Sequence, residues 1–104
     1  IGIAYKRDID DIRESPALDV IELLQQKGAN VRYHDPYVPI LALAGHSYAS
    51  VPLTNLTDYD AVVVLTDHSC IDYKQVVADS VLVLDTRNAT RGLQLYSKAK
   101  IYRL

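Results

Sequence analysis

The chain has 104 residues, of which 49% are hydrophobic and 23% charged, and its formal net charge at pH 7 is −2. This length fits one domain, and the composition is that of an ordinary globular protein. The slight negative charge excludes a global basic field that would attract nucleic acid or an anionic membrane surface. No apolar run is long enough to span a bilayer. The single cysteine, Cys70, cannot form an internal disulfide, which is typical of a protein of the reducing cytoplasm.

The first elements are a strand and a well-marked helix. Residues 1–4 form a short apolar run, which we interpret as the end of a longer first strand, so that the chain is a piece of a larger protein. A charged loop follows over residues 5–14. Ser15 then offers a helix N-cap and Pro16 the first helical position. Apolar residues at helical spacing continue to Leu24, and Gly28 is a suitable stop.

The rest of the chain alternates strand and helix signals. Runs rich in β-branched residues predict buried strands at residues 61–65 and 81–84, with shorter strands at 31–34 and 101–104. A short helix is expected over residues 71–78. Residues 39–52 are ambiguous: 40–44 suit a turn of helix, and 47–51 a short strand.

This alternation predicts the α/β class, as a Rossmann-like, doubly wound and mainly parallel sheet with helices on both faces. Ligands of such folds bind beyond the carboxyl ends of the strands. The polar residues that follow the predicted strands are therefore the candidates for a site. They are Tyr5, Lys6 and Arg7; His34 and Asp35; Asp67 and His68; and Asp85, Thr86, Arg87 and Asn88.

Two of these groups carry cations suited to a phosphorylated ligand. Lys6 can neutralise a diphosphate while the Tyr5 ring packs on a sugar or base, and the Arg87 guanidinium matches a phosphate or a uracil carbonyl. The alternative for Lys6 is a solvated loop in which it pairs with nearby acids. The alternative for Arg87 is a surface ion pair with Asp85 or Glu14.

The remaining candidates favour structural roles. Arg13 is expected to brace the first loop by pairing with Asp10 or Asp11. Asp35 lies where a dinucleotide-binding fold places its ribose-binding acid. However, the first turn has only one glycine of the G-x-G-x-x-G pattern, so we expect Asp35 to be a turn acid and NAD not to bind here.

The histidines show no metal-ligand spacing, and no metal site is predicted. Cys70 and His68 suggest a Cys–His nucleophile only by their closeness in sequence, so both are interpreted as incidental residues.

The opening motif Gly2-x-Ala4-Tyr5-Lys6-x-Asp8-x-Asp10-Asp11-x-Arg13-Glu14-Ser15-Pro16-Ala17 resembles that of the carboxy-terminal domain in UDP-glucose/GDP-mannose dehydrogenases. Later landmarks match in the same order: Gly28-Ala29, Tyr33-His34-Asp35-Pro36, Thr66-Asp67-His68 and Val83-Leu84-Asp85-Thr86-Arg87-Asn88. The resemblance covers essentially the whole chain. Residues 33–39 are more similar to the branch of the family that acts on UDP-N-acetylhexosamines.

The resemblance implies a UDP-sugar-binding domain, spanning residues 1–104, of an NAD-dependent UDP-sugar 6-dehydrogenase that oxidises the sugar C6 alcohol to a carboxylate. It implies that Tyr5, Lys6 and Arg87 contact the nucleotide-sugar, and it leaves Asp10 and Arg13 as loop-bracing residues. NAD and the catalytic cysteine belong to the amino-terminal part of such enzymes. The fragment alone is therefore expected to be inactive, and the full-length enzyme to be a cytoplasmic homo-oligomer that binds neither nucleic acid nor membrane.

Two other classes of function stay open at this point. One is a receiver-like signalling domain, because acidic loops on a doubly wound sheet also describe such modules. The other is a structural or oligomer-forming lobe without a ligand.

Overall fold

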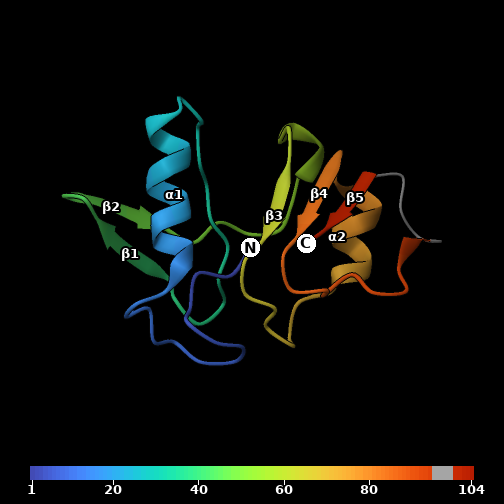
Figure 1. The fold of residues 1–104 in the computed structure, drawn as a ribbon, viewed down its shortest axis with the longest axis horizontal. Helices are drawn as coiled ribbons and strands as arrows, with labels where there is room; N and C mark the ends of the chain where they lie inside the picture. The colour runs from blue at the N-terminus through green and yellow to red at the C-terminus, as the bar shows by residue number, and fades with distance from the viewer. Residues whose placement is uncertain (95–99) are drawn as a thin grey trace.

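A computed structural model describes residues 1–94 and 100–104 (Figure 1). Named within these residues are two α-helices, one short 3-10 helix and five strands. In chain order they are α1 (Pro16–Gln26), β1 (Ile40–Leu43), β2 (His46–Ala49), η1 (Leu56–Asp58), β3 (Val62–Val64), α2 (Tyr73–Asp79), β4 (Leu82–Asp85) and β5 (Lys100–Arg103).

A parallel sheet of three strands, in the order β3-β4-β5, confirms the predicted α/β class. Val62 pairs with Val83, and Leu82 pairs with Lys100. The predicted strands 61–65, 81–84 and 101–104 correspond to these elements within one or two residues, and the last one is an edge strand as expected. The carboxyl ends of β3 and β4 consequently lie side by side.

Helix α1 begins and ends where the sequence predicts. Its N-cap is Ser15, whose Oγ accepts a hydrogen bond of 3.3 Å from the backbone N–H of Ala17, and Pro16 is the first helical residue. At the other end Gly28 has a positive φ of 91°, and the N–H of Ala29 donates to the carbonyl of Leu24. This is a Schellman termination, which satisfies carbonyls that have no partner inside the helix.

Residues 1–4 and 31–34 do not form regular strands, so these two predictions are wrong as stated. Both segments lie beside the sheet in the expected order, because the Gly2 N–H donates to His34 O and the Leu65 N–H donates to Ile1 O. Gly2, however, has a φ of 81°, and a left-handed residue cannot continue a pleated strand. The backbone pairing of residues 1–4 with the neighbouring segments is therefore limited to a few hydrogen bonds.

The ambiguous segment forms an antiparallel hairpin, so the predicted turn of helix at 40–44 is wrong. Strands β1 and β2 pair with Leu43 opposite His46, and the expected strand at 47–51 corresponds in part to β2. The two linking residues, Ala44 and Gly45, have φ values of 52° and 78°. Such a two-residue turn matches the twist of the paired strands.

The residues that the structure describes form two apolar cores. The first includes residues of α1 and of the hairpin, and the second includes residues of β3, β4 and α2. Figure 1 shows α1 and α2 well apart, with β3 between them in this view. Val64 belongs to the second core, whereas Leu65, one residue later, packs against the first. Successive residues of an extended chain point to opposite sides, so residues 64 and 65 connect the end of β3 to both cores.

None of the described helices is long and apolar enough to cross a membrane.

Candidate functional site

Three loops meet beyond the carboxyl ends of β3 and β4, and we call this region the strand-end rim (residues 5–8, 66–69 and 86–91). Arg7 forms an ion pair with Asp67, and the Asp8 carboxylate accepts hydrogen bonds from Ser69. Arg87 connects the third loop to the segment after β3, because its Nε donates a hydrogen bond of 2.9 Å to Leu65 O. The structure thus brings together most of the polar groups that follow the predicted strands, as the parallel topology requires.

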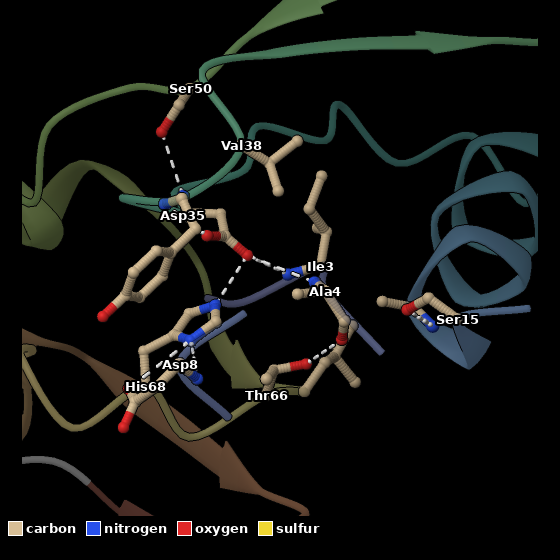
Figure 2. Close-up of polar contacts among 12 residues, drawn as sticks. Ile3, Ala4, Asp8, Ser15, Asp35, Val38, Ser50, Thr66 and His68 are labelled. Carbon is tan, nitrogen blue, oxygen red and sulfur yellow. Dashed lines mark hydrogen bonds and ion pairs between the residues drawn. The ribbon is translucent and has the colours of Figure 1, made fainter. Parts of the chain in front are cut away.

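A buried carboxylate, Asp35, holds the start of the first loop (Figure 2). It is only 1% exposed. Its Oδ2 accepts hydrogen bonds from the backbone N–H groups of Ile3 at 2.8 Å and Ala4 at 3.2 Å, and from His68 Nε2 at 2.9 Å. Its Oδ1 accepts from the N–H of Tyr37 at 2.8 Å. Asp35 is thus a turn acid, as predicted, and its oxygens are occupied inside the protein.

The charge of Asp35 is stabilised by these donors. Burial alone would raise the pKa of the carboxyl group, but the hydrogen bonds from Ile3, His68 and Tyr37 outweigh it and hold the pKa below its usual value. The backbone N–H groups of Ile3 and Ala4 are held in place by their hydrogen bonds to this carboxylate. Asp35 therefore fixes the backbone from which Tyr5 and Lys6 project.

His68 is a structural residue and not an incidental one, which corrects the expectation from the sequence. Its side chain is completely buried. Nδ1 accepts a hydrogen bond of 2.8 Å from the backbone N–H of Asp8, so the proton of the neutral ring lies on Nε2 and is donated to Asp35 (Figure 2). Both ring nitrogens are thus occupied, and His68 cannot activate the exposed Cys70 as a base. The signal in the sequence was the position of His68 directly after a buried strand.

Asp8 closes the first loop against the second. Its backbone is left-handed, with a φ of 63°. Its carboxylate accepts from the Ser69 N–H at 2.7 Å and from the Ser69 Oγ at 2.6 Å, and these hydrogen bonds lower the pKa of Asp8. Tyr5 and Lys6 lie on the loop that these contacts fix and have exposed side chains. The Lys6 Nζ lies 5.8 Å from the centre of the Tyr5 ring.

A second buried carboxylate, Asp85, shapes the loop of Arg87. It accepts hydrogen bonds from the N–H groups of Arg87 at 3.0 Å, Ala89 at 3.1 Å and Thr90 at 2.8 Å, and from the Thr90 hydroxyl at 2.6 Å. Burial would raise the pKa of Asp85, but these donors outweigh it and lower the pKa. The Asp85 carboxylate thus bonds the backbone of Arg87 and not its guanidinium, whose Nε donates to Leu65 O. Within the described residues Arg87 forms no ion pair with Asp85 or Glu14.

The first loop carries a further brace farther from the rim. Arg13 pairs with Asp11 in a bidentate contact, Nε to Oδ1 at 3.0 Å and NH2 to Oδ2 at 2.8 Å. Hydrogen bonds from the Arg13 side chain and backbone lower the pKa of Asp11 to about 2. The partner of Arg13 is therefore Asp11, while Asp10 has no side-chain hydrogen bond to any residue that the structure describes.

The strand-end rim contains a polar pocket of about 360 Å³. We call it the arginine pocket, because its lining includes three arginines: it is lined by Arg7, Asp67, Ser69, Tyr73, Arg87, Asn88, Ala89 and Arg91. Arg87 is the only one of the three predicted ligand contacts in this lining, since Tyr5 and Lys6 lie outside it. The sequence analysis did not single out Arg91. Among the described residues no group of three acidic, histidine or cysteine side chains is placed to hold a metal ion.

A second and larger hollow, of about 780 Å³, has a different character. It lies between α1, the segments 1–3 and 28–34, and β3, and much of its lining is aliphatic, including Ile1, Val20, Leu24, Val31 and Val63. It contains neither of the cation-bearing loops of the rim. The arginine pocket is therefore the better candidate for a charged ligand.

Together these features define a class: an α/β domain with a cation-lined site at the carboxyl ends of parallel strands. The model of the UDP-glucose/GDP-mannose dehydrogenase family, UDP binding domain, matches residues 1–92. The chain belongs to this family, which confirms the resemblance seen in the sequence.

Three relatives illustrate the similarity. A UDP-N-acetyl-D-mannosamine dehydrogenase of Methanococcus maripaludis is 34% identical over 84% of this chain and 21% of its own length. The UDP-glucose 6-dehydrogenase TuaD of Bacillus subtilis is 32% identical over 98% of this chain and 24% of its own length. An NDP-N-acetyl-D-galactosaminuronic acid dehydrogenase of Ralstonia nicotianae is 34% identical over 83% of this chain and 21% of its own length.

The chain thus spans about a fifth to a quarter of the length of the curated relatives that it matches. No solved structure matches it.

Proposed function

We propose that the chain is the nucleotide-sugar-binding domain, residues 1–104, of a longer NAD-dependent UDP-sugar 6-dehydrogenase. The longer enzyme would oxidise the C6 alcohol of the sugar to a carboxylate, and this domain would hold the UDP-sugar. The observation that carries the proposal is the strand-end rim, where Asp35 and Asp85 fix two cation-bearing loops in a chain that matches a UDP binding domain.

Each predicted contact has a defined role in this proposal. Lys6 would neutralise negative charge on the ligand, and the Tyr5 ring beside it would pack on the sugar or base. Arg87 would present its guanidinium to a phosphate or to a uracil carbonyl, since its backbone is held by Asp85 and its Nε is anchored on Leu65 O. Asp10 and Arg13 would contribute only to the shape of the first loop.

The remaining chemistry would lie in other parts of the enzyme. NAD and the nucleophilic cysteine would belong to an amino-terminal domain, with which this domain would form the active site, in a cytoplasmic homo-oligomer. Two of the three relatives are named for N-acetylated sugars, which favours a UDP-N-acetylhexosamine as the substrate.

The test is kinetic and uses the full-length enzyme. Lys6→Ala and Arg87→Ala should each raise the KM for the UDP-sugar about ten- to a hundredfold, because each removes one charge-assisted contact of about 1.5–3 kcal/mol. The KM for NAD should not change. Arg32→Ala is the matched control, since Arg32 is exposed and, among the described residues, its side chain bonds only to its neighbours Asn30 and Val31.

Two results would contradict the proposal. One is a selective loss of NAD affinity in either variant. The other is a normal KM for the UDP-sugar in both, which would favour a structural lobe without a ligand. The 104-residue chain alone should form no NADH from NAD and any UDP-sugar.

A further inference from the structure

The buried ring of His68 connects the first loop of the strand-end rim to Asp35. Its Nδ1 accepts a hydrogen bond of 2.8 Å from the backbone N–H of Asp8, and its Nε2 lies 2.9 Å from the Asp35 Oδ2 (Figure 2). A histidine ring accepts a hydrogen bond only while it is neutral, because both nitrogens of an imidazolium carry a proton. The hydrogen bond between Asp8 and His68 therefore exists in only one charge state of the ring.

A second proton on His68 has no acceptor in the observed arrangement. It would leave the Asp8 N–H facing another N–H group at 2.8 Å. The Asp8 Oδ1 lies 3.9 Å from Nδ1, too far for a hydrogen bond, and it already accepts from the Ser69 N–H at 2.7 Å. Because the ring is completely buried, it is Asp8 that has to move.

The backbone of Asp8 favours such a movement. Its φ of 63° lies in the left-handed region, which a residue other than glycine keeps only while surrounding contacts hold it. The hydrogen bond to His68 holds this backbone, whereas the Asp8 carboxylate is held by Ser69. Loss of the hydrogen bond to His68 would therefore free the backbone of residues 5–8, which carries Tyr5 and Lys6.

We infer that His68 is a positioning residue whose charge sets the conformation of the first loop: the neutral ring holds Asp8 and thereby Lys6, and the protonated ring releases them. This inference rests on the proposed function, because the release weakens the ligand contact of Lys6. Histidine is the side chain that ordinarily changes its charge between about pH 5 and pH 8. The affinity for the nucleotide-sugar is therefore expected to fall as the pH falls through this range.

The ionisable groups that face the ring keep their charge in this range. Burial opposes the charge of Asp35, but its hydrogen bonds outweigh this effect and hold its pKa below the usual value; hydrogen bonds from the second loop lower the pKa of Asp8. The Tyr37 ring lies 4.7 Å from the His68 ring, and the Tyr73 hydroxyl donates to His68 O at 3.0 Å. Burial raises the pKa of both tyrosines, so both stay neutral.

Four further ionisable groups lie near the first two loops. Arg7 and Asp67 form an ion pair, and the hydrogen bond between them raises the pKa of Arg7. Cys70 is exposed, and burial lowers the pKa of the Ile1 amino group to about 6. The test therefore uses the 104-residue chain with Cys70→Ser and an acetylated amino group, so that neither the thiol nor the amine titrates.

The test measures loop and ligand together at pH 8 and pH 5.5. NMR follows the ring nitrogens of His68, the backbone N–H groups of Asp8 and Lys6, and the affinity for UDP-N-acetyl-D-mannosamine, whose diphosphate keeps its charge in this range. With His68 present, the N–H signals should shift as the ring gains its proton, and the affinity should fall about two- to tenfold, the effect of one hydrogen bond.

Two variants without a titrating ring separate the roles of the two nitrogens. His68→Asn can keep an acceptor for the Asp8 N–H, and His68→Gln can keep a donor for Asp35. Both should bind the nucleotide-sugar with an affinity that is nearly independent of pH, and His68→Gln should bind more weakly at pH 8. His46→Asn is the matched control, because His46 is exposed on β2, away from the rim, and its loss should leave the pH dependence unchanged.

The possible failures can be told apart. The inference is overturned, and the proposed function stands, if the ligand binds but the ring stays neutral down to pH 5.5, if the loop signals ignore its protonation, or if His68→Asn keeps the full pH dependence. If the loop signals follow the protonation of His68 but the nucleotide-sugar binds at neither pH, the coupling of ring and loop stands and the proposed function fails.

Discussion

At the scale of single residues, Gly2 shows how closely the rim is packed. A Cβ atom at this position would lie 2.2 Å from the carbonyl oxygen of Thr66. Thr66 in turn donates from Oγ1 to Ala4 O at 2.6 Å. Gly2 therefore allows the first segment to approach β3 closely enough for the loops of the rim to meet.

Gly2→Ala is accordingly expected to destabilise the fold by about 2–5 kcal/mol, since a left-handed φ of 81° and a steric overlap add together. The measurement is the free energy of unfolding in urea. Gly45→Ala is the matched control: Gly45 has a similar φ of 78°, but a Cβ there would meet nothing within 4 Å. Only strain of about 1 kcal/mol is expected at Gly45. Equal losses in the two variants would show that the contact with Thr66 does not matter.

The residues of the rim differ in how far the sequence could reveal them. Lys6 and Arg87 follow predicted strands and match a known motif, so both are candidates from the sequence. The role of His68 was missed, because its partners Asp8 and Asp35 lie 60 and 33 residues away along the chain and no local pattern encodes such contacts. Arg91 was missed for a related reason: it reaches the rim only because Asp85 folds its loop back.

At the scale of elements, the helices and strands with clear local sequence signals are the ones that the sequence predicted correctly. Helix α1 has an N-cap, a proline, a helical apolar stripe and a terminal glycine, and all agree with the structure. Strand β3 consists of three valines, and β4 has three aliphatic residues before Asp85. The hairpin β1–β2 has no such signal, since its turn contains Ala44, a residue that rarely adopts a left-handed conformation. Its strands depend instead on packing, and Leu41 is buried in the first core.

The cap of α1 provides a prediction at this scale. Ser15→Ala should lower the free energy of unfolding by about 0.5–2 kcal/mol, because the N–H of Ala17 loses its buried acceptor. The denaturant midpoint measures the loss. Ser47→Ala is the control, since Ser47 is exposed on β2. Ser15→Gly should cost only a few tenths of a kcal/mol, because glycine is itself tolerated at an N-cap. An unchanged midpoint for Ser15→Ala would mean that the hydroxyl does not stabilise the helix.

At the scale of the whole molecule, topology carried more information than any single motif. Strands that run parallel place their carboxyl ends at one edge, so the position of the site followed from the order of strands and helices. The shape of the site did not, because it depends on two buried carboxylates, Asp35 and Asp85, most of whose donors are backbone N–H groups. Those N–H groups are present at every residue except proline, so the sequence does not show which ones converge.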